Sequence, residues 1–599
     1  MTLCNHLLFT GGTYEAPMVQ CVHTSVHALH HRVRDAPHRG KLAHHGTHTV
    51  ASPSALSRRP EKMSNTSETT TRPLPPGVTE DDLDNALAAF AEAIGAENVA
   101  TDAESLEDFQ DPFQVPGTAT NVPSGVVSPR STEHVQAIVK IANQYKIPLW
   151  PIGRGKNNGY GGAAPQVRGS VMLSFREMNK VLEINEELGY AIVEPGVSWY
   201  DLHDAIEAGG HSLVASIVDI GWGGVVSNTL EHGLTYMPYS IDQASHCGFE
   251  VVLPNGDLMR TGSGAMDNNP TWPLYKRGLG PTSTEMFMQS NYGIVTKMGY
   301  WLMPKPETYM PLWLRVWDEE QMPAVVDALR ELMLDGTIDM RPQLSNTLCM
   351  ASMLTTRAEW YTGEGPMPEE VIDKIAKEMG LGRWMMRFAL YGDEAVVDHN
   401  FAKLEARFLR IPSVDLVGQK HGKEAWETLP NPHERVQIGV PSQDLYKMAG
   451  WSGGEEGGHV DFSPVIPLTG KNAIAAQKMM REMCAEAGLD FLGGMLPINA
   501  RSTTFINVIA FDTKNPEQVA NAYALAKRMV AEAGKRGYGE YRAHLSFMDL
   551  AAEQFGFNDH ALRRFNEQIK DTLDPNGIIA PGKSGIWGTR MREAGFPQV

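Results

Sequence analysis

A glycine-rich segment between residues 153 and 162 has the composition of an anion-binding loop. It reads Gly153-Arg-Gly-Lys-Asn-Asn-Gly-Tyr-Gly-Gly162 and follows a short apolar run that predicts a strand. Backbone N–H groups in such a loop can converge on an anion. Arg154 and Lys156 add positive charge, and two asparagines add amide donors. A plain surface turn could have the same composition, so spacing alone leaves phosphate binding and a turn both open.

The spacing of the glycines excludes the dinucleotide-binding motif GxGxxG. That motif opens a helix whose N-terminus faces the pyrophosphate. Here Gly153-x-Gly155 is followed by three residues before Gly159, and Gly161-Gly-Ala-Ala-Pro165 cannot start a helix cleanly. A phosphate in this segment would therefore be held by the loop itself.

Four motifs, in order along the chain, resemble one known family. They are Gly155-Lys-Asn-Asn-Gly-Tyr-Gly-Gly-Ala-Ala-Pro165, Glu194-Pro-Gly-Val197, Ser290-Asn-Tyr-Gly-Ile-Val-Thr296 and Asp574-Pro-Asn-Gly-Ile-Ile-Ala-Pro-Gly-Lys583. The chain is similar, over about residues 75–590, to the family of vanillyl-alcohol oxidase, eugenol oxidase and the flavoprotein of para-cresol methylhydroxylase (PCMH). The resemblance implies an α+β, two-domain FAD-binding fold of the PCMH type. Both chain ends would build the flavin domain, and the middle would form a substrate-binding cap.

The resemblance also implies which residues hold FAD. They are Gly153, Gly155, Lys156, Asn157, Asn158, Gly159, Pro195, Gly196, Asn228, Gly293, Ile294, Val295 and Lys583.

The flavin of the family's oxidases is often tethered to a histidine that precedes a Phe-Ser-Pro strand. Gly457-Gly-His459-Val-Asp-Phe-Ser-Pro464 matches that segment. His459 is therefore expected to bind FAD covalently through an 8α-histidyl bond, since a neutral imidazole nitrogen is a nucleophile. The alternative is a histidine that only packs against the flavin ring. The methylhydroxylase uses a tyrosine several residues earlier, where this chain has Ala449 or a neighbour, and Tyr446 is out of register.

Three further residues resemble the family's phenol-binding trio. They are Tyr160 in the glycine-rich loop and the adjacent Tyr541 and Arg542. A cation and two hydroxyl donors around one oxygen would favour the phenolate form of a bound phenol. Arginine suits this task because it keeps its charge when buried.

Asp219, in Ile217-Val-Asp-Ile-Gly-Trp-Gly-Gly224, matches the acid that stands near the flavin N5 atom in the oxidases. The resemblance implies a base that assists water addition or receives an alcohol proton, whereas the alternative is an aspartate that caps the glycine turn. Tyr236 is a further expected pocket residue. The chain departs from the family at Tyr239-Ser-Ile-Asp242 and at Thr504-Phe505, where the oxidases often have Tyr-Gly-Asp-His and paired histidines. These changes leave the exact substrate open.

Hydrophobic periodicity predicts the elements that must position these residues. The spacing of apolar residues predicts helices, and short apolar runs predict strands. The predicted helices are 81–93, 132–142 capped by Ser131, 199–208, 324–334, 370–379, 473–487 and 559–572, the last stopped by Asp574-Pro-Asn-Gly577. The predicted strands are 126–127, 148–152, 171–173, 190–193 and 505–511.

The expected domain order is an FAD-binding part over residues 75–306, a cap over 307–537 and a C-terminal part over 538–599 that completes the FAD domain. Residues 1–74 are expected to be a disordered leader. Its first 62 residues hold nine of the 20 histidines and only three acids. A transit peptide or a metal-binding histidine tract are the alternatives.

A net charge of −19 argues against nucleic-acid or anionic-membrane partners. No apolar run approaches the roughly 20 residues of a membrane span. The five cysteines are scattered, which argues against a disulfide framework and favours a cytoplasmic location. No CxxC or HExxH pattern indicates a zinc site.

The expected activity is oxidation of 4-substituted phenols, by hydride transfer to flavin through a quinone methide, with O2 reduced to hydrogen peroxide. Alkylphenols, eugenol-type allylphenols and 4-hydroxybenzylic alcohols are the expected substrates, and a homo-oligomer is the expected assembly. One alternative is a dehydrogenase that passes electrons to a cytochrome. The other is a flavin-binding subunit without activity of its own.

Overall fold

The structure is a computed structural model that describes residues 72–114, 120–426 and 428–597. The leader predicted for residues 1–74 lies outside the described residues except for 72–74, as do Cys4 and Cys21.

The glycine-rich loop follows the edge strand of a four-stranded sheet with order β1-β2-β4-β3. The strands are β1 (Val99–Ala100), β2 (Gly125–Val127), β3 (Leu149–Ile152) and β4 (Val171–Ser174). β2, β4 and β3 run parallel. The chain's C-terminal part joins this sheet, because the Leu149 N–H donates to the carbonyl of Ile578 at 2.7 Å.

Two amphipathic helices, α2 (Glu80–Ile94) and α4 (Thr132–Tyr145), share a hydrophobic core with this sheet. Leu83, Leu87 and Phe90 of α2 are buried, as their spacing predicts. The Ser131 side chain caps α4 by accepting from the His134 N–H, which confirms the predicted cap.

A second sheet is antiparallel and has the order β5-β6-β10-β8-β9. Its strands are β5 (Val181–Asn185), β6 (Tyr190–Val193), β10 (Ile294–Trp301), β8 (His246–Val252) and β9 (Leu258–Arg260). Two helices follow β6 in the chain, α5 (Trp199–Ala208) and α6 (Val225–Leu230), and β7 (Leu213–Val214) pairs with β11 (Met303–Pro304). A capping box of Ser198 and Asp201 starts α5 at the predicted residue.

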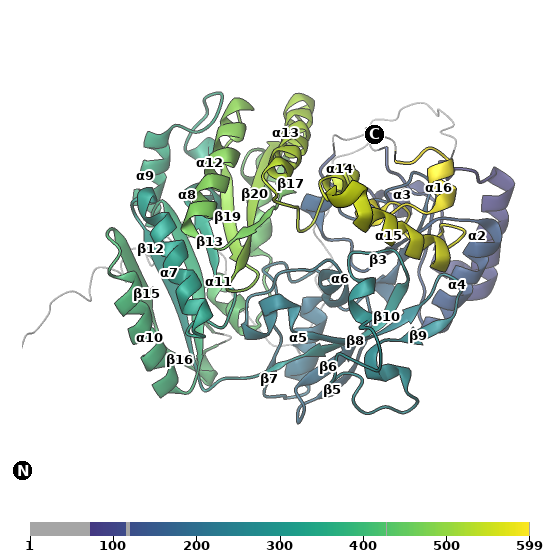
Figure 1. Cartoon of the computed structure of the whole chain (residues 1–599), viewed down its shortest axis with the longest axis horizontal. Coiled ribbons are helices and arrows are strands. Elements are labelled where there is room, and N and C mark those ends of the chain that lie inside the picture. The colour runs from purple at the N-terminus through teal and green to yellow at the C-terminus, as the bar shows by residue number, and fades with distance from the viewer. Residues whose placement is uncertain (1–71, 115–119, 427, 598–599) are drawn as a thin grey trace, which may run out of the picture. The chain divides into compact units, whose positions relative to one another are not determined.

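The third and largest sheet is antiparallel and has the order β15-β12-β14-β13-β19-β20-β17. Its strands are β12 (Thr308–Val316), β13 (Gln343–Asn346), β14 (Trp384–Gly392), β15 (Val414–Gly418), β16 (His421–Gly422), β17 (Gly457–Phe462), β18 (Val465–Pro467), β19 (Leu492–Pro497) and β20 (Ser502–Asp512). Figure 1 shows long helices alongside this sheet, namely α7 (Met322–Leu334), α9 (Glu369–Met379), α10 (Glu394–Phe408), α12 (Gly470–Glu486) and α13 (Pro516–Lys535). Shorter helices in this part of the chain are α8 (Thr347–Ser352) and α11 (Pro432–Arg435).

The C-terminal part contains α14 (Met548–Glu553), α15 (Phe557–Leu573) and α16 (Thr589–Glu593). The predicted stop of α15 is confirmed, because Gly577 has a φ of +60° and the buried Asp574 carboxylate accepts from the Ile578 and Ile579 N–H groups. Its predicted start at Asp559 is wrong. Residues 558–560 have left-handed φ values, so the regular right-handed helix begins after His560.

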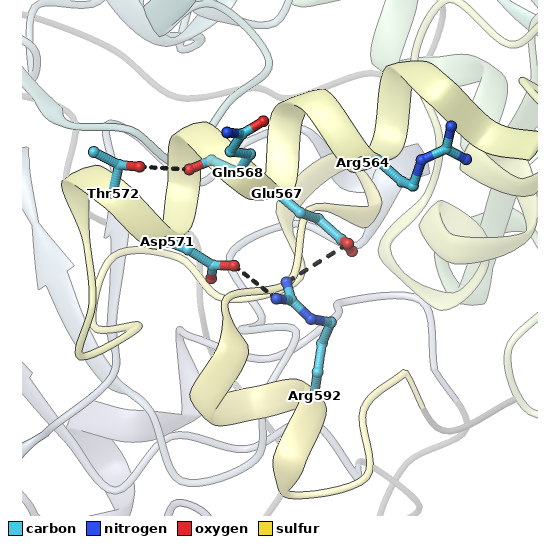
Figure 2. A pocket seen from close by; sticks show the side chains of 6 residues that line it. All are labelled: Arg564, Glu567, Gln568, Asp571, Thr572 and Arg592. Atoms are coloured by element: carbon cyan, nitrogen blue, oxygen red, sulfur yellow. Dashed lines mark hydrogen bonds and ion pairs between the residues drawn. The ribbon is translucent and has the colours of Figure 1, made fainter.

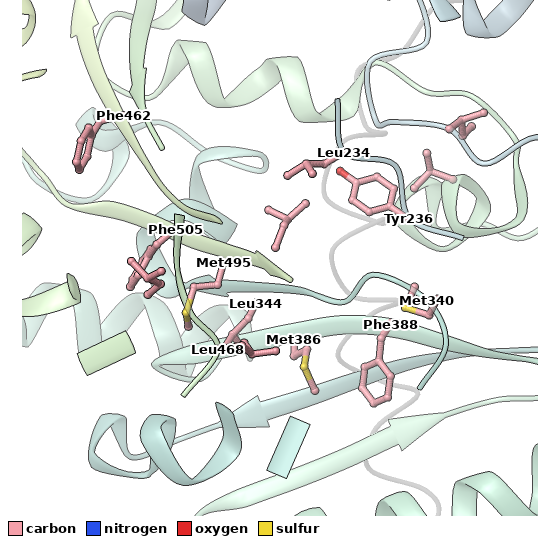
Figure 3. Packing of buried hydrophobic residues seen from close by; sticks show 14 of the residues in the cluster. Leu234, Tyr236, Met340, Leu344, Met386, Phe388, Phe462, Leu468, Met495 and Phe505 are labelled. Carbon is pink, nitrogen blue, oxygen red and sulfur yellow. The ribbon is translucent and has the colours of Figure 1, made fainter. Parts of the chain in front are cut away.

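One hydrophobic core joins the large sheet to the segment that carries Tyr236. Figure 3 shows Leu234 and Tyr236 beside side chains of the large sheet and its connections. The labelled residues from that side are Met340, Leu344, Met386, Phe388, Phe462, Leu468, Met495 and Phe505. Close apolar packing of this kind fixes the segment that carries Tyr236 relative to the large sheet.

Among the described residues, no helix is long and apolar enough to cross a membrane. The described part of the chain also contains no cluster of side chains that could hold a metal ion. Cys247, Cys349 and Cys484 are buried free thiols.

Candidate active site

The glycine-rich loop packs tightly against the predicted Glu194–Val197 motif and against α6. A Cβ atom at Gly153 would lie 3.0 Å from the carbonyl oxygen of Pro195 and 3.0 Å from the Ser227 hydroxyl oxygen in α6. Gly155 has a φ of +66°, which favours glycine. Arg154 donates to the carbonyl of Gly196 at 3.4 Å. The loop is therefore held beside the Glu194–Val197 turn and the N-terminal end of α6.

His459 lies in β17, directly against this loop. A Cβ atom at Gly159 would lie 2.5 Å from the His459 Cε1 atom and 2.5 Å from the Asp461 Oδ2 atom. The Nδ1 atom of His459 lies 2.8 Å from Asp461 Oδ1, and the Phe113 ring centroid lies 5.1 Å from the imidazole centroid. The structure thus brings the predicted tether residue and the predicted phosphate loop together.

The predicted phenol-binding trio forms one cluster. The Arg542 guanidinium lies 5.3 Å from the ring centroid of Tyr160 and 5.3 Å from that of Tyr541. Burial raises the pKa of the Tyr160 hydroxyl well above its ordinary value, and Tyr541 and Asp461 add to this effect while Arg542 opposes it. Tyr160 is therefore a hydroxyl donor at neutral pH.

Polar contacts fix Arg542 in this position. Its Nε and Nη2 atoms donate to the carbonyl of Glu231 at 3.1 and 2.8 Å, and Nη1 lies 3.3 Å from Asn157 Oδ1. The Glu231 carboxylate in turn pairs with Lys583 at 2.7 Å. Burial opposes the charge of Arg542, but Tyr541, Tyr160 and Glu231 raise its pKa above the ordinary value. Arg542 therefore keeps its positive charge beside the rings of Tyr160 and Tyr541.

Asp219 is fully buried and faces an arginine from the large sheet. Its Oδ2 atom accepts from Arg387 in β14 at 2.7 Å, whereas no described group is hydrogen-bonded to its Oδ1 atom. The same guanidinium lies 4.7 Å from the Tyr236 ring centroid. Burial, with the Asp219 carboxylate adding to it, raises the pKa of Tyr236. A buried carboxylate oxygen without a partner is costly and is a suitable acceptor for a bound water or substrate hydroxyl.

Four residues that the sequence prediction missed complete this region. Arg387 pairs with Asp219, and Asp461 contacts His459. Ser463 binds the Tyr160 hydroxyl through its Oγ atom at 2.9 Å and accepts from the Tyr541 N–H through its carbonyl. Glu540 accepts from the Ser463 N–H at 2.9 Å. Asp461 and Ser463 alternate with His459 along one extended segment, which is the one local signal that could have indicated them.

Some predicted FAD residues lie apart from the glycine-rich loop. Ile294 and Val295 start β10 and pair with Val252 and Val251, and a Cβ atom at Gly293 would lie 2.6 Å from the Val251 side chain. No described hydrogen bond or ion pair joins these three residues to residues 153–162. Their neighbour Asn291 donates instead to the carbonyls of Ala580 and Ile586.

Three other predicted FAD residues contact protein groups near the glycine-rich loop or in α6. Asn228 packs in α6 against Gly233, and the Asn158 amide lies 3.4 Å from the Tyr446 hydroxyl. Lys156 lies over the Trp222 ring at 5.3 Å from its centroid.

The hollow shown in Figure 2 is a separate feature on α15 and α16. Arg592 pairs there with Asp571 and Glu567, and none of the predicted site residues lines it. This surface hollow is therefore separate from the candidate active site.

Comparison with known proteins identifies the family. Residues 123–262 match the FAD binding domain family, and residues 473–584 match the family of FAD linked oxidases, C-terminal domain. The chain is 36% identical over 516 residues to the 4-cresol dehydrogenase [hydroxylating] flavoprotein subunit of Pseudomonas putida, which covers 86% of this chain and 97% of that protein.

Two solved structures have the same fold over most of the chain. One is 4-ethylphenol oxidase from Gulosibacter chungangensis in an isoeugenol complex, with a TM-score of 0.82, 35% identity and coverage of 87% of this chain and 100% of that one. The other is p-cresol methylhydroxylase with substrate bound, with a TM-score of 0.81, 36% identity and coverage of 86% and 99%. The predicted PCMH-type fold is therefore confirmed. The chain belongs to the p-cresol methylhydroxylase and vanillyl-alcohol oxidase family of FAD-linked oxidoreductases.

Proposed function

We propose that this protein is an FAD-dependent oxidase of 4-substituted phenols. The observation that carries the proposal is the cluster of Tyr160, Tyr541 and Arg542, in which one buried cation lies 5.3 Å from two tyrosine rings. The names of the relatives, 4-cresol dehydrogenase and 4-ethylphenol oxidase, indicate para-alkylphenols as the substrate class.

The cluster would bind the substrate oxygen as a phenolate. Arg542 supplies the charge, and the two tyrosine hydroxyls supply donors. Negative charge on the ring oxygen pushes electrons toward the para position and so weakens a benzylic C–H bond. Ser463 contributes by holding Tyr160 through its Oγ atom and Tyr541 through its carbonyl.

Asp219 would act on the para side chain. Oδ2 is held by Arg387, so the unpartnered Oδ1 can accept a proton from water as it adds to a quinone methide. With a 4-hydroxybenzylic alcohol, Oδ1 would instead receive the alcohol proton. Tyr236, stacked on Arg387, would help to fix this carboxylate.

The residues present fit FAD. Gly153, Gly159 and Gly196 let the chain segments around the loop pack closely on one another, and Arg154 and Lys156 supply charge for phosphate. When bound, FAD supplies the two-electron acceptor. In this proposal residues 75–306 and 538–599 hold FAD, residues 307–537 cover the substrate, and His459 carries the covalent 8α-histidyl bond.

An oxygen-electrode screen tests the proposal. Purified protein is supplied with 4-ethylphenol, eugenol, vanillyl alcohol and syringyl analogues, and oxygen uptake and hydrogen peroxide are measured. An oxidase consumes oxygen and forms peroxide in step with product.

A dehydrogenase that passes electrons to a cytochrome is the second candidate, and the name of the P. putida relative favours a dehydrogenase. Turnover that requires an added electron acceptor would identify it and would rule out the oxidase. Bound FAD that no phenol reduces would identify the third alternative, a subunit without activity of its own.

Fluorescence of a denatured gel band tests the tether separately. The His459→Ala variant is expected to lose the fluorescent band. Tyr446→Phe is the matched control, because its hydroxyl also lies near the loop, 3.4 Å from the Asn158 amide. A band that persists in His459→Ala and disappears in Tyr446→Phe would move the tether to the tyrosine.

A further inference from the structure

His459 and Asp461 stand on the same face of β17. Alternate residues of a strand point to the same side, and the pairing of β17 with β20 is regular from Gly457 to Phe462. The Nδ1 atom of His459 and the Oδ1 atom of Asp461 are 2.8 Å apart. His459 is 9% and Asp461 8% exposed, so water competes little for this contact.

The imidazole ring is clamped on two more sides. Gly159 approaches so closely that a Cβ atom there would lie 2.8 Å from Nδ1 and 2.5 Å from Asp461 Oδ2. The Phe113 ring lies on another side, with its centroid 5.1 Å from that of the imidazole. Within the described residues, no group is hydrogen-bonded to the Nε2 atom of His459. The imidazole is therefore held through its Nδ1 atom, and its Nε2 atom has no hydrogen bond to a described residue.

We propose that Asp461 is the positioning residue that prepares His459 for bond formation with FAD. A carboxylate that accepts from Nδ1–H fixes the tautomer in which Nε2 carries the lone pair. It also stabilises the positive charge that develops on the imidazole as Nε2 is alkylated. This inference rests on the tether proposed above and adds the residue that directs it.

Dioxygen is the oxidant for formation of the bond between His459 and FAD. One C–H bond of the flavin 8-methyl group breaks, and a bond forms between that carbon and Nε2. Two electrons remain on the flavin ring system. Dioxygen takes these two electrons, with the methyl proton and the proton of the imidazole, and leaves as hydrogen peroxide. Asp461 acts on the imidazole alone and needs no contact with FAD.

The surrounding contacts favour a role of Asp461 in positioning His459 over a role as the counter-ion of Arg542. Arg542 is already held by the carbonyl of Glu231 and by Asn157. The one hydrogen bond that the structure gives the Asp461 side chain is to His459. The neighbouring acid, Glu540, is held by the Ser463 N–H and its pKa is raised, mainly by burial and further by Asp461. The hydrogen bond of the Asp461 carboxylate is thus directed at the imidazole.

The test measures covalent FAD in the full-length protein. Asp461→Ala, Asp461→Asn and the exposed control Glu456→Gln, which precedes β17, are incubated with added FAD. The flavin that survives denaturation is followed over time by gel fluorescence, and total bound flavin is measured by absorbance. We expect Asp461→Ala to bind FAD but to form the bond roughly 10- to 100-fold more slowly, with Asp461→Asn between it and wild type. Glu456→Gln should match wild type.

Tethering of Asp461→Ala at the wild-type rate would overturn the inference. If that variant binds no FAD, Asp461→Asn decides, and a wild-type rate there is equally contrary. His459→Ala in the same gel separates the two claims. A fluorescent His459→Ala band refutes the histidyl tether itself, whereas no band there with a normal rate in Asp461→Ala refutes only the role of Asp461.

Discussion

Arg542 makes three hydrogen bonds that depend on the shape of its guanidinium. Nε and Nη2 donate to one carbonyl, and Nη1 reaches Asn157. Lysine keeps the charge but lacks the planar fork. We predict that Arg542→Lys lowers kcat/KM for 4-ethylphenol by about 10- to 100-fold, because charged hydrogen bonds contribute about 1.5–3 kcal/mol. Steady-state kinetics measure the effect, and Arg528→Lys, an exposed arginine of α13, is the control. Unchanged kcat/KM would exclude Arg542 from the phenolate site.

Asp219 is predicted to determine which product forms at the para side chain. Asp219→Asn keeps the shape of the side chain but removes the base beside Arg387. Water addition should slow by about 100-fold, so 4-ethylphenol should give less benzylic alcohol and more vinylphenol. Chromatography of the products measures the ratio. An unchanged ratio would show that water is activated by another group.

At the scale of elements, the glycine-rich loop and β17 are fitted to each other at Gly159. An added methyl group would lie within 2.5 Å of both His459 and Asp461. We predict that Gly159→Ala lowers the covalent flavin content several-fold, measured by gel fluorescence. Gly450→Ala is the control, because nothing lies within 4 Å of a Cβ atom at that position. Wild-type flavin content in Gly159→Ala would mean that the two elements can separate without cost.

Elements with strong local signals could be predicted from the sequence. The bounds of helices α5 and α7 and of strand β6 agree with the predicted bounds to within two residues. The left-handed start of α15 could not, because asparagine and aspartate are compatible with both helix and turn.

The candidate site was predictable where its residues are carried by motifs, as for His459 and Arg542, which the structure places beside the glycine-rich loop. Arg387 was not, because it comes from β14 and meets Asp219 across 168 positions of sequence. Only the pairing of distant elements brings the two together.

At the scale of the whole molecule, Glu540 links stability to pH. Burial raises its pKa well above the ordinary value. Above the ordinary glutamate pKa the unfolded chain loses this proton while the folded chain keeps it, so the folded state binds more protons and its stability falls as pH rises. We predict that Glu540→Gln removes this loss, up to about 1.4 kcal/mol per pH unit. Denaturant unfolding between about pH 5 and pH 7 measures it, and equal pH slopes for both proteins would contradict the prediction.

Anaerobic reduction of the bound flavin by 4-ethylphenol, followed by absorbance, tests the proposed function most directly. This reaction stops at the reduced flavin, so the result does not depend on whether oxygen or a cytochrome is the electron acceptor. It reports only whether the site oxidises a phenol. We predict rapid bleaching in the wild-type protein and strongly slowed bleaching in Arg542→Lys. A flavin that stays oxidised with 4-ethylphenol and with every other 4-substituted phenol would contradict the proposed function.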